Sequence, residues 1–188
     1  MYLVTFDEKK ALKDIEKLIN ETIPEVSFVN TFKFGRLLKN GKTLIMGLPN
    51  KGLKSLPDTI GTLSSLQDLV LFSNELVTLP NSIGNLKKLK FLNLVNNKIE
   101  NLPETFGNLE SLEILFLNQN ELKTLPESFG SLKCLKRLNL RNNKLTELPK
   151  SFNELYNLEM LWIDNNPLNE SAHKILRQLK KENVTLDI

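Results

Sequence analysis

Apolar residues recur along the middle of this chain with a period of 23 residues. Leu89, Leu112 and Leu135 mark the period, and each full copy follows the pattern LxxLxLxxNxLxxLPxxφGxLxx, in which φ is Phe or Ile. Full copies occupy residues 66–88, 89–111, 112–134 and 135–157, a degraded copy occupies 43–65, and a further copy begins at Leu158. Because one unit of this length cannot bury its own apolar face, the pattern predicts coils that stack into a solenoid.

Each recurring position has a structural reason. The alternating LxL segment predicts a short strand whose leucines point inward. The asparagine that follows is able to bond the backbone of the neighbouring coil, so stacked copies are expected to form an asparagine ladder. The proline favours a first helical or 3-10 turn on the opposite, convex side. We assign to the scaffold the asparagines Asn74, Asn97, Asn120, Asn143 and Asn166, the prolines Pro57, Pro80, Pro103, Pro126 and Pro149, and the glycines Gly61, Gly84, Gly107 and Gly130.

This repeat resembles the leucine-rich-repeat family, and the resemblance covers about three quarters of the chain. It implies an α/β fold, a solenoid with a curved parallel sheet on the concave side and short helical or 3-10 segments on the convex side. In this family a ligand usually meets the concave sheet, so the resemblance implies a module that binds another protein. The LPxxφG form is similar to intracellular repeats that bind signalling proteins, including small GTPases. The alternative is therefore a non-catalytic regulator of such an enzyme.

The first 42 residues are expected to cap the open end of the stack, and residues 43–168 to form six repeats. A helix is predicted at about 7–20, with Asp7 as its N-cap and Pro24 as the residue that stops it. Its apolar stripe consists of Ala11, Leu12, Ile15, Leu18 and Ile19. Asn40-Gly41 lies between two strand-like runs and predicts a hairpin, so that a strand at about 34–39 folds back antiparallel on the first repeat strand.

Residues 169–188 are expected to cap the other end. A helix is predicted at about 170–181, with Ala172, Ile175, Leu176 and Leu179 on one face. Counting 23 residues onward from Leu161 and Ile163 reaches Val184 and Leu186, which predicts a seventh repeat strand at 184–186. The alternative for this helix is a docking surface for a partner.

The candidate binding site consists of the residues on the concave sheet that flank the inward-facing leucines. They are Asp68, Val70, Phe72, Phe91, Asn93, Val95, Ile114, Phe116, Asn118, Arg137, Asn139, Arg141, Met160, Trp162 and Asp164. Phe, Ile, Val, Met and Trp are frequent among them, although the scaffold does not need apolar residues there. Clustered exposed apolar groups usually mark an interaction surface, and aromatic residues and Arg are the usual anchors of interfaces. The alternative is that these residues only favour strand structure and pack against their neighbours.

Charged positions alternate in sign from coil to coil. The residue after the opening leucine runs Gln67, Lys90, Glu113, Lys136 and Glu159, and the residue after the ladder asparagine runs Glu75, Lys98, Glu121, Lys144 and Pro167. In register, such side chains lie about 5 Å apart and pair laterally. Most of these charges are therefore expected to be partners within the chain. Arg137 and Arg141 depart from the pattern, and Asp164 is the expected partner of Arg141.

Composition excludes several other functions. The net charge of +3 on 188 residues gives no concentrated basic face, so neither nucleic acid nor a membrane is an expected partner. Cys134 is the single cysteine, which excludes an internal disulfide and favours a reducing, cytoplasmic location. The residues from Met1 to Lys10 do not resemble a signal peptide, and no apolar run approaches the roughly 20 residues of a membrane span.

Residues that would support catalysis or metal binding are scarce. His173 is the single histidine, and together with Cys134 it supplies too few ligands for a zinc site. The two residues are also two coils apart, so a catalytic Cys–His pair is not expected. No phosphate-binding glycine loop occurs, since the glycines follow the repeat. We therefore expect no enzyme activity, cofactor or metal, and a protein partner. A monomer is expected, with a dimer through the concave face or the C-terminal edge strand left open.

Overall fold

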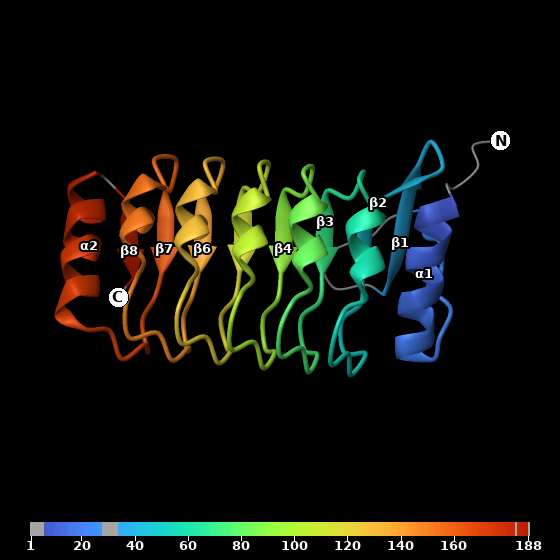
Figure 1. The fold of residues 1–188 in the computed structure, drawn as a ribbon, viewed down its shortest axis with the longest axis horizontal. Coiled ribbons are helices and arrows are strands. Elements are labelled where there is room, and N and C mark those ends of the chain that lie inside the picture. Colours follow the sequence, from blue (N-terminus) through green and yellow to red (C-terminus); the bar gives the residue numbers. More distant parts are fainter. Residues whose placement is uncertain (1–5, 28–33, 183, 188) are drawn as a thin grey trace.

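The 23-residue period of leucines forms a row of stacked coils, each of which contributes one strand (Figure 1). The structure is a computed structural model and describes residues 6–27, 34–182 and 184–187. Helix α1 (Phe6–Ile19) covers one end of the row and helix α2 (Glu170–Lys181) covers the other. The strands between them are β1 (Gly35–Lys39), β2 (Lys42–Gly47), β3 (Asp68–Val70), β4 (Phe91–Asn93), β5 (Ile114–Phe116), β6 (Arg137–Asn139), β7 (Met160–Trp162) and β8 (Thr185–Asp187).

These strands form one sheet in the order of the sequence, from β1 to β8. Strands β1 and β2 pair antiparallel, and the following pairs are parallel. From β3 to β7, residues 23 apart face one another, so that the inner leucines form one fully buried row. The row consists of Leu69, Leu92, Leu115, Leu138 and Leu161. The predicted solenoid with its parallel sheet is confirmed.

The convex side consists of short 3-10 helices, each of which begins directly after the proline of its coil. Their bounds are η1 (Asp58–Thr62), η2 (Asn81–Asn85), η3 (Glu104–Asn108), η4 (Glu127–Ser131) and η5 (Lys150–Glu154). Each helix buries one large apolar residue. Phe106, Phe129 and Phe152 stack in parallel, with ring centroids 6.1 and 6.0 Å apart. These rings continue the core on the convex side because no inward-facing strand residue reaches it.

The asparagine ladder joins each coil to the coil before it. The Asn120 side-chain nitrogen donates to the carbonyl oxygens of Leu94 at 2.9 Å and Leu117 at 3.0 Å. Its side-chain oxygen accepts from the backbone N–H of Ile99 at 3.0 Å. The residue before it, Gln119, has a φ of 60° and turns the chain out of the strand. A side-chain amide is needed here because it donates and accepts at the same time.

Successive convex helices pack so closely that glycine is required between them. A Cβ on Gly130 would overlap the backbone carbonyl oxygen of Ser151 in the next coil. The corresponding position of the next coil, in η5, is Asn153. In the following coil α2 takes the place of another 3-10 helix, so the close helix-to-helix contact that requires glycine does not recur there.

The N-terminal cap forms as a helix and a hairpin, with three differences from the sequence prediction. Asp7 lies inside the first turn of α1, which begins one residue earlier, so Asp7 is not the N-cap. Leu18 belongs to the predicted apolar stripe but is 49% exposed, because α1 packs against η1 along a narrower face. Asn20 ends the helix with a φ of 50°, well before Pro24.

Polar contacts join the N-terminal cap to the first coil. The buried Glu8 carboxylate accepts from the backbone N–H of Thr43 at 2.5 Å, and Asp14 accepts from the Thr59 hydroxyl at 2.8 Å. In the hairpin, Asn40 and Gly41 have φ values of 53° and 73°, as a tight two-residue turn between β1 and β2 requires. Strand β1 therefore covers the sheet edge that β2 would otherwise expose.

The C-terminal cap contains α2 at Glu170–Lys181, where the sequence predicts a helix at 170–181. The Asn169 side chain caps this helix by accepting from the backbone N–H of Ala172 at 2.9 Å. The predicted register of the final strand is wrong. Leu161 faces Leu186, not Val184, so this coil is two residues longer than the others because a full α-helix replaces the 3-10 helix.

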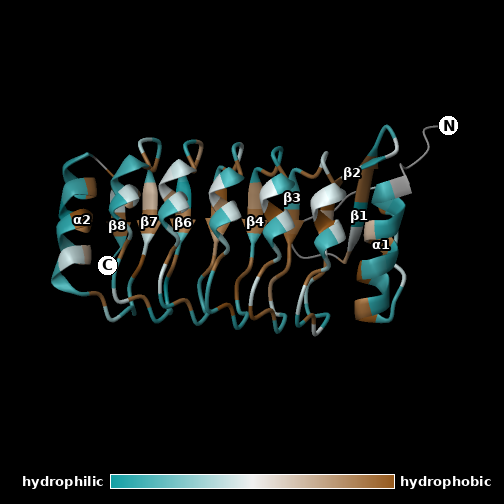
Figure 2. Ribbon diagram, in the orientation of Figure 1, coloured by the Kyte–Doolittle hydropathy of each residue, from teal (hydrophilic) through white to brown (hydrophobic). Residues whose placement is uncertain are grey.

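Hydropathy follows this architecture (Figure 2). Strands such as β4 are hydrophobic, whereas α2 is largely hydrophilic. The apolar residues of α2 that are buried are Ala172, Ile175, Leu176 and Leu179. The polar outer surface of α2 closes this end of the core, which leaves the face of the sheet as the place to look for a binding site.

Candidate functional site

Strand register arranges the outward-facing residues of the sheet in two rows, on either side of the buried leucines. We call these the first and second rows. The first row runs Ile45, Asp68, Phe91, Ile114, Arg137, Met160 and Thr185. The second row runs Gly47, Val70, Asn93, Phe116, Asn139, Trp162 and Asp187. A third set lies two residues beyond the second row and consists of Phe72, Val95, Asn118, Arg141 and Asp164. Because side chains alternate along a strand, all three lie on the face opposite the inner leucines.

The predicted exposure of the candidate site is wrong at two positions in the second row. Val70 is only 2% exposed, and Asn93 is also buried. Val70 lies in the second row between Gly47 and Asn93. Asn93 folds back, and its side-chain oxygen accepts from the backbone N–H of Val95 at 3.1 Å. The other thirteen candidate residues are half-buried, apart from Arg137, which is exposed.

Asn139 repeats the behaviour of Asn93, two coils later. Its side-chain oxygen accepts from the backbone N–H of Arg141 at 3.1 Å. One end of each amide therefore holds the chain as it leaves the strand. This local role explains why asparagine alternates with apolar residues in the second row without any reference to a ligand.

Aromatic residues pack against their diagonal neighbours across the sheet. The rings of Phe91 and Phe116 meet edge to face, with centroids 5.8 Å apart at an angle of 88°. Two coils further on, the Arg137 guanidinium lies over the ring of Trp162 at 5.6 Å. Both pairs join the first row of one coil to the second row of the next. Positions two coils apart thus carry a ring contact in one case and a cation–π contact in the other.

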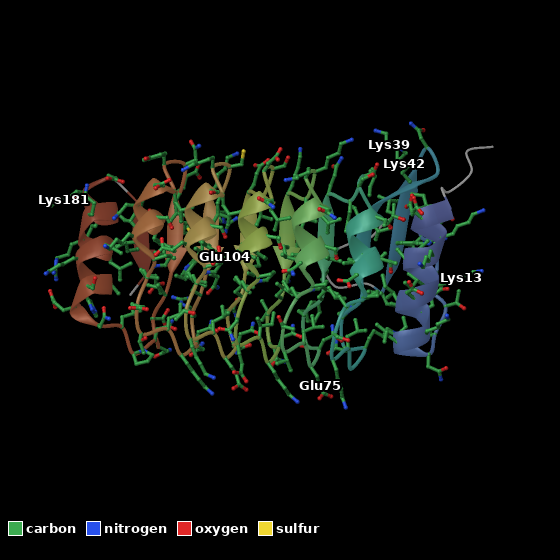
Figure 3. All side chains as sticks on the ribbon, viewed as in Figure 1. Lys13, Lys39, Lys42, Glu75, Glu104 and Lys181 are labelled. Atoms are coloured by element: carbon green, nitrogen blue, oxygen red, sulfur yellow. The ribbon has the colours of Figure 1, made fainter. Side chains whose placement is uncertain are left out.

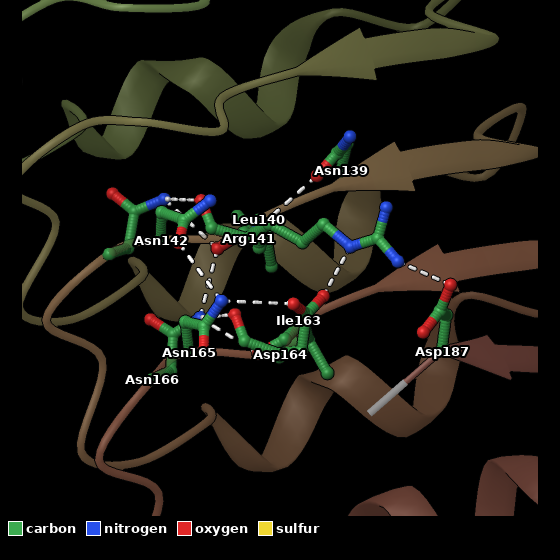
Figure 4. Close-up of polar contacts among 10 residues, drawn as sticks. Asn139, Leu140, Arg141, Asn142, Ile163, Asp164, Asn165, Asn166 and Asp187 are labelled. Carbon is green, nitrogen blue, oxygen red and sulfur yellow. Dashed lines mark hydrogen bonds and ion pairs between the residues drawn. The ribbon is translucent and has the colours of Figure 1, made fainter.

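Arg141 is neutralised by two carboxylates from later coils. Figure 4 shows its guanidinium between Asp164 and Asp187, with an ion pair to each. The hydrogen bond to Asp164 is the main cause that raises the pKa of Arg141, which keeps it charged. The expected pairing with Asp164 is confirmed, whereas the Asp187 contact was not predicted. Arg141 is therefore held by the scaffold and is not a free cation.

The alternating charges pair at the edges of the sheet as expected. Lys98 binds Glu75, Lys136 binds Glu113 and Lys144 binds Glu121, each at 2.8 Å. Figure 3 shows Glu75 at the edge of the stack, where the turns after the strands project. In each pair the lysine's hydrogen bond is the main cause that lowers the pKa of the glutamate. These charges satisfy one another and frame the apolar rows.

Asp68 differs from the other carboxylates of this face. It lies in the first row between Ile45 and Phe91, and among the described residues it has no hydrogen bond or ion pair. Burial raises the pKa of Asp68, and the nearby charge of Lys90 opposes that rise. The site thus contains a half-buried carboxylate that the nearby charge of Lys90 compensates only in part.

The sequence interpretation missed several residues of this face, which lie at its two ends. Ile45 lies 23 residues before Asp68, so the repeat period would have identified it had counting begun one coil earlier. Leu37 faces Ile45 in the hairpin, and only the register of that hairpin places it there. Thr185 and Asp187 join the rows at the far end. Their positions depend on the longer final coil, which the 23-residue period does not indicate.

The fold does not bring Cys134 and His173 together as a catalytic pair. Cys134 is a free, exposed thiol, and His173 lies on α2, where its Nδ1 is 2.8 Å from the Asn169 carbonyl oxygen. Among the residues that the structure describes, no three His, Cys, Asp or Glu side chains are grouped as metal ligands. Within the same residues, no helix has the length and apolar character needed to cross a membrane.

Comparison with known proteins gives a consistent result. The model of the leucine-rich repeat region family matches residues 42–115 and 81–184. The chain is similar to the leucine-rich-repeat ectodomain of the receptor kinase SOBIR1 from Arabidopsis thaliana, with 26% identity, a TM-score of 0.71, and coverage of 89% of this chain and 97% of that one. It is also similar to an internalin, inlF, from Listeria monocytogenes, with 25% identity, a TM-score of 0.61, and coverage of 70% and 37%. No curated protein matches significantly.

The family match spans both the sheet and the convex helices of the stack, and leucine-rich-repeat proteins generally mediate protein–protein interaction. Domains of this kind are non-catalytic binding domains. The matched region includes the strands from β2 to β7. The chain therefore belongs to the leucine-rich-repeat family.

Proposed function

We propose that this chain binds a protein partner on the concave face of its sheet, with Phe91, Ile114 and Phe116 at the centre of the contact. The observation that carries the proposal is the edge-to-face pair of Phe91 and Phe116, which is only half-buried although the inner positions of the same strands are filled by leucine. Such rings provide a large contact area at low cost in side-chain entropy.

The charges around this centre support the same proposal. Lys136 with Glu113 and Lys144 with Glu121 are already paired, and Arg141 is held by two carboxylates. A partner that approached these groups would gain little, because exposed and paired charges contribute little to binding. The apolar centre, surrounded by a polar rim, has the composition that protein interfaces usually have.

The test is affinity capture from a native lysate, with the wild-type chain compared to a Phe116→Ala/Trp162→Ala double variant. The matched control is Tyr156→Ala, because Tyr156 is 74% exposed and lies outside the concave rows. We expect a partner retained by the wild type and by the control to be lost with the double variant. Removing an aromatic anchor of an interface typically costs about 2 kcal/mol or more, which is roughly a 30-fold loss of affinity.

Circular dichroism of each variant verifies that the fold is retained. The proposal is contradicted if the folded double variant captures the same proteins, in the same amounts, as the wild type. A partner lost only with Tyr156→Ala would move the binding site to the edge of the stack.

A further inference from the structure

The first row of the concave face carries two charges of opposite sign that form no ion pair with any residue the structure describes. Asp68 on β3 and Arg137 on β6 are separated by Phe91 on β4 and Ile114 on β5. The four residues lie in register on adjacent strands, so they form a straight line across the sheet. Its composition is acid, apolar, apolar, base.

Asp68 lacks a partner that would compensate its charge. Among the described residues it forms no hydrogen bond or ion pair, although Lys90 acts on it through a weaker long-range attraction. It is half-buried beside Ile45 and Phe91. A carboxylate in such surroundings gains from a donor that approaches from the open side, because low-polarity neighbours strengthen the interaction.

Arg137 is the complementary case at the other end of the line. It forms no ion pair among the described residues, and its cation–π contact with Trp162 uses only one face of the guanidinium. The N–H groups at the rim of that plane remain available for a carboxylate, which the planar fork binds in a bidentate manner. Arg141, the other arginine of this coil, already forms ion pairs with Asp164 and Asp187.

The spacing of these charges limits what fits between them. Three strand intervals separate Asp68 from Arg137, which is about 14 Å at about 4.8 Å per strand. In an extended peptide, residues i and i+4 are about 13–14 Å apart, and residues i, i+2 and i+4 face the same side. A basic residue, an apolar residue and an acidic residue at these three positions would therefore meet Asp68, the Phe91–Ile114 pair and Arg137.

We infer that the concave face recognises an extended segment of a partner protein with the pattern base-x-apolar-x-acid, read in either chain direction, which crosses strands β3 to β6. This inference rests on the proposed function and names the chemistry of the partner. The segment lies across the strands because β4 and β5 are paired on both sides within the sheet. Their backbone groups are used, so recognition operates through side chains and does not extend the sheet.

The test uses synthetic peptides with blocked termini and the wild-type chain. The matching probe is Thr-Lys-Thr-Leu-Thr-Asp-Thr. Three probes serve as comparisons: one with Asp in place of Lys, one with Lys in place of Asp, and Thr-Lys-Leu-Asp-Thr-Thr-Thr, which has the same composition but a shorter spacing. Binding is followed by NMR titration of the Asp68 and Arg137 amides and by the fluorescence of Trp162, the single tryptophan. We expect the matching probe to bind about five- to tenfold more tightly than the others.

Charge reversal on the protein makes the test independent of overall affinity. Asp68→Lys should prefer the probe with two acidic residues, and Arg137→Glu should prefer the probe with two basic residues. The controls Asp58→Lys and Lys88→Glu make the same changes in net charge outside the rows and should retain the wild-type preference. A switch in preference requires a folded protein, so loss of structure cannot imitate it.

Two outcomes overturn the inference. One is a wild-type chain that binds all four probes within about twofold of one another. The other is a preference that remains the same after both charge reversals. If either occurs while the Phe116→Ala/Trp162→Ala variant still loses its captured partner, the concave binding site stands and only the charge pattern fails. Concentration-dependent dimerisation abolished by Arg137→Glu, without peptide discrimination, would also overturn it, in favour of a second copy of the chain.

Discussion

The Asn120 side chain donates a hydrogen bond to the backbone carbonyl oxygen of Leu94, one coil earlier, at 2.9 Å. The same amide accepts from the N–H of Ile99, so one side chain bonds two backbone groups of the preceding coil. This arrangement recurs at Asn74, Asn97 and Asn143. The ladder therefore holds adjacent coils in register through buried polar contacts.

Replacing Asn120 by alanine should lower the free energy of unfolding by about 1–3 kcal/mol, because the buried backbone N–H of Ile99 loses its acceptor. The carbonyl oxygens of Leu94 and Leu117 keep the side chains of Asn97 and Asn143 as donors. The matched control is Asn118→Ala on the same coil, whose side chain forms no hydrogen bond among the described residues and which should cost well under 1 kcal/mol, as a surface substitution does (about 0.5 kcal/mol). Urea denaturation measures both. Equal losses for the two variants would contradict the role of the ladder.

Gly130→Ala should destabilise the chain, because the added Cβ would overlap the carbonyl oxygen of Ser151. We expect a loss of about 1–3 kcal/mol, as for overpacking in a close-packed interior, with a lower midpoint in thermal denaturation. Asn153 is the control, since it takes the glycine position in η5 and already carries a side chain. Asn153→Ala should change the midpoint little, and a larger loss there than at Gly130 would refute the packing argument.

Acidification should weaken the fold through the paired glutamates. The pKa values of Glu75, Glu113 and Glu121 are lowered in the folded chain, chiefly by hydrogen bonds from lysines. Their contribution is present above the unfolded pKa, about 4.3, and is lost as the pH falls through the folded values. Asp68 acts in the opposite sense, because its raised pKa favours the folded chain in acid and this contribution is lost as the pH rises through the folded value.

Since three lowered values oppose one raised value, the free energy of unfolding should decrease between about pH 5 and pH 3. Lys136→Met should return the pKa of Glu113 toward its ordinary value and leave that of Glu121 lowered. NMR titration of the glutamate side chains measures both effects in one sample. A Glu113 pKa that does not change in the variant would show that the Lys136 contact is not formed in solution.

The cation–π contact predicts a spectroscopic effect. Arg137→Ala should expose the ring of Trp162 to water, so that its emission moves to longer wavelength, with a loss of about 0.5–1 kcal/mol of stability. Lys136→Ala is the control, because Lys136 is the neighbouring residue but pairs with Glu113 at the sheet edge. An emission maximum that moves equally in both variants would rule out a specific contact between Arg137 and Trp162.

Much of the architecture follows from the sequence because the repeat is local. A leucine every 23 residues places one strand in each coil, and the asparagine and proline that follow decide where the chain bends and where the convex helix begins. The pairing of Lys98 with Glu75 follows from the same count, since strands in register bring residues 23 apart together. The N-terminal hairpin follows from Asn40-Gly41, whose turn geometry few other dipeptides adopt.

Features that depend on how elements meet were decided by the tertiary structure. The length of α2 moves the last strand by two residues, which brings Asp187 to Arg141 and removes Arg141 from the free cations of the concave face. Val70 is buried, although its position in the repeat predicts exposure. A periodic sequence determines which residues share a row, because each coil repeats the same backbone path. Whether a residue in that row is covered, paired or free depends on the sizes and charges of side chains from other coils, and only packing brings those together.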